Sequence, residues 1–381
     1  MKKPLKNQTI YQVFVRNHTE EGTFLALIND LPRIKGIGVD IIYLLPIHEI
    51  GIKARKGVYG SPYSIRDYRS ISEDLGTLED FNALIKESHR LGLKVMMDMV
   101  FHHTSRDAVY IKTNPEWYIY KNGQLANKVG DWSDICDFEI NNLNLQEYLI
   151  QTLIYWTKLG VDGFRFDVAS MVPINFWKFA RRAVGSVNPN TIWLAESIEI
   201  EFRDYLRSLG EVAEDDETLY QAFDVLYDYD IFKEFKAAVE DASNVEAYIN
   251  ALNAQRKRHG NNLKLHFLEN HDQDRIASML SKKRHLNWIK FMYMIYGVNF
   301  IYAGEEFGLK HKPDLFNKDP LDLSVIDREV HQAYLDAVAL KKEMASLDVE
   351  VMKINYIGHG QVELILNKEY RGQNKYMIDL S

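Results

Sequence analysis

Strand-like apolar runs alternate with helix-like amphipathic stretches over most of the 381-residue chain, and this alternation constrains the fold more than any other feature. An apolar run at 41–45 is followed by helical spacing at 78–91, which ends at a glycine, and the next apolar run covers 94–101. About eight such β–α units fit into roughly 340 residues, a pattern that indicates a parallel sheet. We therefore predict an α/β fold of the (β/α)8 TIM-barrel type. No G-x-G-x-x-G motif follows the first strand, which argues against an open doubly wound sheet.

One long segment interrupts the alternation after the third predicted strand. Residues 102–143 are rich in Asn, Asp, Trp and Tyr, and the segment is far longer than an ordinary connection between a strand and its helix. We predict that this segment forms a small inserted lobe at the active-site end of the barrel. We expect Trp117 and Trp132 to pack in the interior of the lobe.

The last part of the chain has a different pattern. In residues 347–381, two runs at 349–356 and 362–367 resemble strands, so we predict a short C-terminal β appendage. The barrel is then expected to consist of 1–101 together with 144–346.

The composition of the chain argues against some classes of binding partner. The formal net charge of −8 and the lack of a Lys/Arg-rich patch argue against nucleic acid. No stretch approaches the ~20 apolar residues of a membrane span, and no apolar signal-peptide core follows the first residues. Cys136 is the single cysteine, so an internal disulfide cannot form. These features favour a cytoplasmic protein that does not act on membranes, and they leave its oligomeric state open.

Polar and ionisable residues gather where four of the predicted strands end. These segments are 97–103 (MDMVFHH), 163–169 (GFRFDVA), 192–197 (IWLAES) and 267–272 (FLENHD). Because TIM barrels carry their active sites at the C-terminal ends of the strands, these carboxylates, histidines and arginine should meet in one space.

The four segments, in this order, resemble the motifs of the α-amylase family of glycoside hydrolases. The resemblance runs from about residue 10 to 302, and four motifs in register are far more specific than any one alone. Further segments that resemble the family are 38–46 (GVDIIYLLP), 60–68 (GSPYSIRDY), 75–81 (LGTLEDF) and 300–306 (FIYAGEE). The resemblance implies a barrel that cleaves α-linked glucose oligomers with retention of configuration.

The resemblance also implies roles for three carboxylates. Asp167 matches the nucleophile, Glu196 the general acid/base, and Asp272 the third carboxylate, which grips sugar hydroxyls. In a retaining enzyme the two reacting carboxyl groups lie about 5–5.5 Å apart. Glu196 must start protonated, so we expect burial and nearby negative charge to raise its pKa.

Five further residues are expected to bind substrate or support the site. His103 and His271 resemble the family's sugar-binding histidines, and Tyr63 resembles a platform beneath the sugar ring. Arg165 precedes Asp167 by two residues on the same strand face, so it should keep that carboxylate ionised and oriented. Asp98 is expected to support Arg165.

The chain departs from the family pattern at the positions that serve calcium in many relatives. His102 stands where those relatives have Asn, and Ala169 and Ser170 stand where they often have Lys-His. Calcium requires oxygen ligands, so we predict no calcium at that site. We also predict no metal at His102 and His103, because adjacent side chains on a strand point to opposite faces, and no cofactor.

The function that follows is hydrolysis of α-1,4-linked glucooligosaccharides, with an α-glucan or maltooligosaccharide as substrate. A glycosyltransferase or sugar phosphorylase would use the same covalent intermediate and pass the glucosyl group to a sugar or to phosphate. A non-catalytic sugar-binding relative is a third alternative, which the retained Asp167 and Glu196 argue against. Chain-length preference and exo or endo action remain open.

Overall fold

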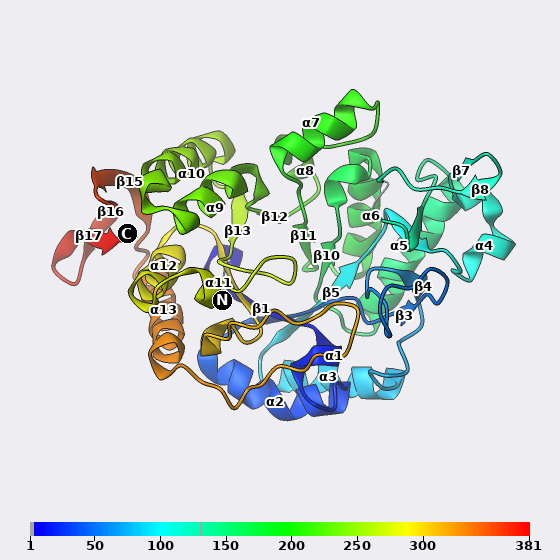
Figure 1. The fold of residues 1–381 in the computed structure, drawn as a ribbon, viewed down its shortest axis with the longest axis horizontal. Coiled ribbons are helices and arrows are strands. Elements are labelled where there is room, and N and C mark those ends of the chain that lie inside the picture. The colour runs from blue at the N-terminus through cyan, green and yellow to red at the C-terminus, as the bar shows by residue number, and fades with distance from the viewer. Residues whose placement is uncertain (1–3, 130–131) are drawn as a thin grey trace.

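The computed structural model describes residues 4–129 and 132–381, and within them eight parallel strands close into a barrel (Figure 1). The order around the barrel is β1-β14-β13-β12-β11-β10-β5-β2. These strands are β1 (Thr9–Val13), β2 (Ile41–Leu44), β5 (Lys94–Met99), β10 (Gly163–Phe166), β11 (Ile192–Ala195), β12 (Val225–Tyr227), β13 (Leu263–His266) and β14 (Val298–Tyr302). The predicted (β/α)8 barrel is confirmed.

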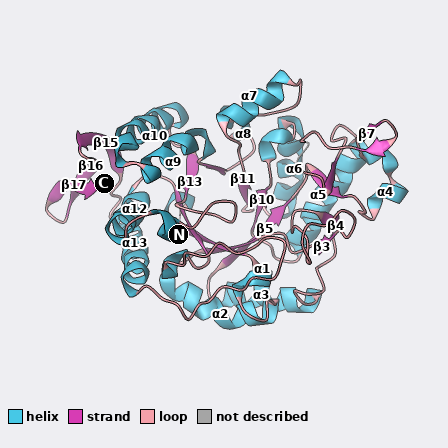
Figure 2. Cartoon of the chain, viewed as in Figure 1, coloured by secondary structure: helices cyan, strands magenta, loops and turns pink. Residues whose placement is uncertain are grey.

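Helices form an outer layer around the barrel (Figure 2). Their bounds are α1 (Val15–His18), α2 (Phe24–Ile37), α3 (Leu78–Arg90), α4 (Tyr110–Thr113), α5 (Leu143–Lys158), α6 (Ile174–Val187), α7 (Ile200–Ser208), α8 (Asp216–Leu219), α9 (Phe232–Glu240), α10 (Val245–His259), α11 (Ile276–Met279), α12 (Lys282–Met294) and α13 (Arg328–Ser346). Short 3-10 turns are η1 (Leu5–Asn7), η2 (Pro115–Trp117), η3 (Ala169–Met171), η4 (Tyr229–Ile231), η5 (Ala242–Asn244) and η6 (Glu305–Phe307). Within the described part of the chain, no helix combines the length and the apolar character needed to cross a membrane.

Local sequence explains where the helices begin. Thr77 accepts a hydrogen bond from the backbone N–H of Asp80, and the Asp80 carboxylate accepts one from the N–H of Thr77. This reciprocal capping box satisfies two of the free N–H groups at the start of α3. Asn142 caps α5 in a similar way, because its side-chain oxygen accepts from two backbone N–H groups in the first turn.

Successive side chains of β10 point alternately to the surrounding helices and to the site. Phe166 points outward, where its ring lies 4.6 Å from that of Trp177 on α6 and 4.8 Å from that of Trp193 on β11. Arg165 has the opposite orientation, and it pairs in register with Asp98 of β5. The apolar and polar residues of this strand therefore serve the core and the site respectively.

The segment after β5 folds into short antiparallel ladders. Its strands are β6 (His103–Ser105), β7 (Tyr120–Lys121), β8 (Gln124–Leu125) and β9 (Ile135–Asp137), and β6 pairs with β9 while β7 pairs with β8. Trp117 is buried here, with its ring 5.9 Å from that of Tyr110. Two strands, β3 (Glu49–Ile50) and β4 (Ile65–Asp67), form a further small ladder. The exact boundaries of the lobe, 102–143, stay a prediction.

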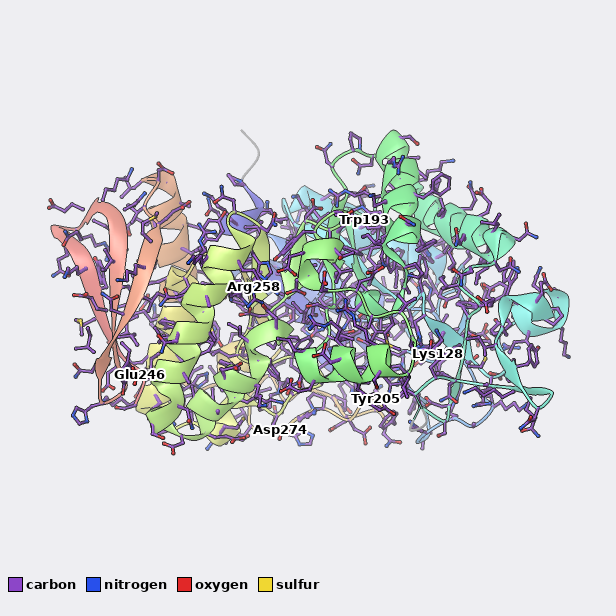
Figure 3. The ribbon with its side chains drawn as sticks, turned by 90° about the horizontal axis from the view of Figure 1, so that it is seen from above. Lys128, Trp193, Tyr205, Glu246, Arg258 and Asp274 are labelled. Atoms are coloured by element: carbon purple, nitrogen blue, oxygen red, sulfur yellow. The ribbon has the colours of Figure 1, made fainter. Side chains whose placement is uncertain are left out.

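The C-terminal segment forms an antiparallel sheet of β15 (Val351–Gly358), β16 (Gln361–Tyr370) and β17 (Gln373–Asp379). This sheet packs on α10 and α12, at the opposite end of the molecule from β7 and β8 (Figures 1 and 3). The β appendage was predicted from its first two strands. The third strand was not predicted, because it begins with three exposed polar residues.

Candidate active site

A cavity of about 370 Å³ lies where the barrel strands end. It is lined by Lys56, Ser61, Tyr63, His103, Trp132, Asp134, Ile135, Asp167, Val168, Glu196, His271, Asp272, Leu315 and Phe316. Six of the eight predicted site residues are among these. The other two, Asp98 and Arg165, are fully buried beneath the cavity.

The barrel ladder holds the carboxylates of Asp167 and Glu196 one residue beyond their strands. The backbone N–H of Asp167, after β10, donates to the carbonyl of Met99 at 3.0 Å. The N–H of Glu196, after β11, donates to the carbonyl of Phe166 at 3.0 Å. Because β10 and β11 are neighbours, both side chains enter the same cavity.

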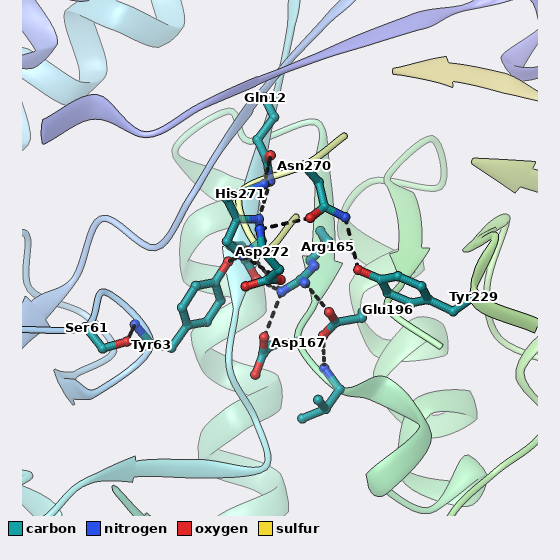
Figure 4. Close-up of polar contacts among 12 residues, drawn as sticks. Gln12, Ser61, Tyr63, Arg165, Asp167, Glu196, Tyr229, Asn270, His271 and Asp272 are labelled. Atoms are coloured by element: carbon teal, nitrogen blue, oxygen red, sulfur yellow. Dashed lines mark hydrogen bonds and ion pairs between the residues drawn. The ribbon is translucent and has the colours of Figure 1, made fainter. Parts of the chain in front are cut away.

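Arg165 connects the acidic residues of the site (Figure 4). Its Nη1 donates to Asp98 Oδ1 at 2.9 Å and to Asp167 Oδ1 at 2.9 Å. Its Nη2 lies 2.9 Å from Glu196 Oε1, without the alignment of a hydrogen bond. The guanidinium thus supports a negative charge on Asp167 more directly than one on Glu196.

The site raises the pKa of both carboxyl groups. Burial raises the pKa of Asp167 to about 7, against the opposing charge of Arg165. Burial raises the pKa of Glu196 well above its usual value, and the charges of Asp167 and Asp272 raise it further. As pH increases, Asp167 therefore loses its proton first, and the site then holds one carboxylate beside one carboxylic acid.

A strained turn follows Asp167. Val168 has φ +38° and ψ +46°, a left-handed conformation that is rare for a β-branched residue. In this conformation its backbone N–H donates to Glu196 Oε2 at 2.7 Å. Strain of this kind persists where the surrounding structure holds it, often at a functional site.

A hydrogen-bond chain sets the tautomer of His271. Gln12 of β1 accepts from the backbone N–H of His271 at 3.3 Å, so its amide nitrogen faces His271 Nδ1 at 3.0 Å and donates to it. The ring proton is then on Nε2, which lies 2.6 Å from the hydroxyl of Tyr63 and 3.2 Å from Asp272 Oδ2. Tyr63 in turn donates to Asp98 Oδ2 at 3.0 Å. Its ring stacks on that of His271, with centroids 5.3 Å apart and an interplanar angle of 16°.

Several residues of the site were not predicted from the sequence. Gln12 is a polar residue within the apolar run from Ile10 to Val15, which is the signal that could have identified it. Trp132 was expected in the lobe interior, yet it lines the cavity with its ring centroid 5.7 Å from that of His103. Tyr229, from η4, accepts a hydrogen bond from Asn270 at 3.0 Å, and no local pattern marks it.

One side of the cavity is closed by contacts between distant segments. Lys56 Nζ lies 3.0 Å from Asp134 Oδ1, and it sits over the ring of Phe316. The loop that carries Lys56 is anchored nearby, because the N–H of Tyr59 donates to the carbonyl of Phe316 at 2.9 Å and the N–H of Val58 donates to Asn317 Oδ1 at 3.0 Å.

His102 and His103 do not point to opposite faces, so that sequence argument was wrong. β5 ends at Met99, and the strand alternation no longer holds at these positions. Their Nδ1 atoms lie 3.3 Å apart, and Asp137 completes a buried group. Two imidazoles and one carboxylate do not provide the six to eight oxygen ligands that calcium takes, so the donor set does not fit calcium.

Comparison with known proteins shows the family to which the chain belongs. The family model described as "Alpha amylase, catalytic domain" matches residues 10–132 and 129–353. The crystal structure of an α-amylase from Lactobacillus plantarum is 42% identical, with a TM-score of 0.88, and the match covers 95% of this chain and 88% of that one.

Two curated relatives match over less of their own length. The intracellular maltogenic amylase of Bacillus subtilis is 25% identical over 91% of this chain and 58% of that protein. An α-1,4-glucan:maltose-1-phosphate maltosyltransferase of Chlorobaculum tepidum is 34% identical over 50% of this chain and 32% of that protein. This chain spans about half the length of several curated relatives that it matches. It belongs to the α-amylase family of glycoside hydrolases.

Proposed function

We propose that this protein is a retaining glycoside hydrolase that cleaves α-1,4-linked glucooligosaccharides through a covalent glucosyl–Asp167 intermediate. The observation that carries the proposal is one buried guanidinium placed between two carboxyl groups, with burial raising the pKa of both. A retaining glycosidase needs this pair, one group as nucleophile and the other as acid.

In the first step, the Asp167 carboxylate attacks the anomeric carbon while Glu196 gives its proton to the departing glycosidic oxygen. The C–O bond to the leaving sugar breaks, and an ester to Asp167 forms. Glu196, now ionised, takes a proton from water as that water attacks the anomeric carbon and frees Asp167. His271 and Asp272 face the same cavity and hold sugar hydroxyls.

A proton NMR time course with maltoheptaose, with and without phosphate, tests the proposal. Early release of products with the α-anomeric configuration, independent of phosphate, is the expected result. First-formed β-anomers would contradict a retaining mechanism.

The alternative is a glycosyltransferase or a sugar phosphorylase that uses the same intermediate. The similarity of half of this chain to the maltosyltransferase from Chlorobaculum tepidum supports this alternative. Glucose-1-phosphate that forms only when phosphate is present would identify a phosphorylase. Longer oligosaccharides in place of net hydrolysis would identify a transferase. A binding protein without turnover is disfavoured by the paired carboxylates.

We further propose that short maltooligosaccharides are the preferred substrates. The cavity is near the lower end of the about 300–1,000 Å³ range of small-molecule sites, and the Lys56–Asp134 pair closes one side. We also propose a cytoplasmic location, supported by the single cysteine and by the relative named as intracellular.

Lys56→Ala is expected to raise kcat/KM for maltoheptaose relative to maltotriose by about 1.5- to 5-fold. The Lys56 side chain is partly exposed whereas Asp134 is buried, and we take the about 0.2–1 kcal/mol of an ion pair that solvent screens at one member. Loss of the pair should let this loop move to admit a longer sugar chain. Initial rates on both substrates give the ratio. Lys283→Ala removes an exposed pair with Asp379 far from the cavity and should leave the ratio unchanged. An unchanged ratio in Lys56→Ala as well would contradict the assigned role.

A further inference from the structure

We propose that His102, His103 and Asp137 form a binding site for a divalent transition-metal ion, with zinc as the expected occupant. His103 begins β6 and lies opposite Asp137 of β9 in the antiparallel ladder, and His102 directly precedes His103. The ladder fixes their relative positions. All three are buried, with exposed fractions of 4%, 4% and 0%.

The spacing of the donor atoms matches a tetrahedral ion. His102 Nδ1 lies 3.3 Å from His103 Nδ1 and 3.7 Å from Asp137 Oδ1. One donor atom from each residue lies within 4.8 Å of the others. Ligands at about 2.0–2.1 Å from zinc in a tetrahedron are separated by about 3.3–3.5 Å, so an ion fits between these atoms with small movements.

Hydrogen bonding leaves part of this group unsatisfied. Asp137 Oδ2 accepts from the backbone N–H of Lys128 at 2.7 Å, whereas Oδ1 has no hydrogen-bond donor among the described residues. The Lys128 ammonium is held 2.7 Å from Glu211. A buried carboxylate oxygen without a donor is costly, and a bound cation satisfies it.

The donor types select the class of metal. Two imidazole nitrogens and one carboxylate oxygen suit zinc and its transition-metal neighbours, whereas calcium and magnesium require mainly oxygen. No metal was predicted at these residues from the sequence, because strand alternation was expected to continue through them.

The ion links the inserted segment to the catalytic cavity. His103 lines the cavity, so coordination through Nδ1 fixes its ring and leaves the proton on Nε2 as a donor. His103 is thereby a positioned sugar-binding group, and the ion takes no part in bond cleavage.

Calorimetric titration of the chelator-treated full chain with ZnCl2, together with thermal unfolding, tests the proposal. We expect one zinc per chain at this site and a Tm that rises with zinc, because the ion binds the folded state. CaCl2 at equal concentration should produce no comparable rise. A chain that takes up no zinc, or that responds equally to calcium, would overturn the proposal.

His102→Phe keeps a ring but removes the nitrogen donors, and it should weaken zinc binding by at least about 100-fold. His259→Phe is the matched control, because His259 belongs to a second, largely buried group with Asp216 and Asp230. Zinc binding that is lost in His259→Phe and kept in His102→Phe would move the ion to that second group and refute the assignment.

A spectroscopic readout covers the case in which His102→Phe does not fold. Co²⁺ added to the metal-free wild-type chain should give the intense visible absorption of a tetrahedral nitrogen–oxygen site. Weak absorption, as of octahedral Co²⁺ in water, would overturn the proposal without any variant.

Discussion

Asp167→Asn is expected to lower kcat on maltoheptaose by about 10³-fold or more, because a neutral amide cannot attack the anomeric carbon as a carboxylate does. The variant should fold normally, since its side-chain oxygen can still accept the 2.9 Å hydrogen bond from Arg165. Initial rates of product release measure the effect, and the Tm checks the fold. Asp336→Asn, on the exposed face of α13, is the control and should keep the wild-type rate.

Substitution of Asp167 by a smaller residue distinguishes loss of the nucleophile from general damage to the site. Asp167→Ala leaves space for azide, which can attack the anomeric carbon from the same face while Glu196 protonates the leaving oxygen. The expected product is the β-glucosyl azide, formed with partial recovery of the rate. An Asp167→Asn variant with the wild-type rate, or an azide product of α configuration from Asp167→Ala, would remove Asp167 from the nucleophile role.

The barrel was predictable because its strands share a local signature. Most are short apolar runs, and those of the site carry a polar side chain next to their last residue, as with Asp98 on β5 and Arg165 on β10. These strands are neighbours, so residues far apart in sequence meet in register. The eight site residues could be named because segments of the chain resemble the motifs of the α-amylase family, and the structure brings them together in and beneath one cavity.

Contacts that depend on loop paths could not be predicted. The orientation of His102 is set after β5 ends, where strand alternation no longer applies. The hydrogen bond between Gln12 and His271 joins the first strand to the end of the seventh, and the Lys56–Asp134 pair joins two loops. Neither member of these pairs carries a local pattern that identifies its partner. These contacts form only because tertiary packing brings the two partners together.

Glu196→Gln is expected to affect substrates according to their leaving groups. General acid catalysis contributes about 10²–10⁴-fold, so kcat/KM for maltoheptaose should fall within that range. An α-glucosyl fluoride needs little protonation of its leaving group, and its formation of the glucosyl–Asp167 ester should be far less affected. Burst-phase kinetics measure that step separately. Equal losses on both substrates would contradict the acid role of Glu196.

The pH profile supplies a second test of Glu196. In the wild type, kcat/KM should rise with pH as Asp167 ionises near its pKa of about 7, and should fall at higher pH as Glu196 loses its proton. Gln cannot ionise, so Glu196→Gln should keep the rise at low pH and lose the decline at high pH. If the decline persists in Glu196→Gln, another group supplies the proton. If the rise disappears while the decline remains, the protonation states of Asp167 and Glu196 are the reverse of those assigned here.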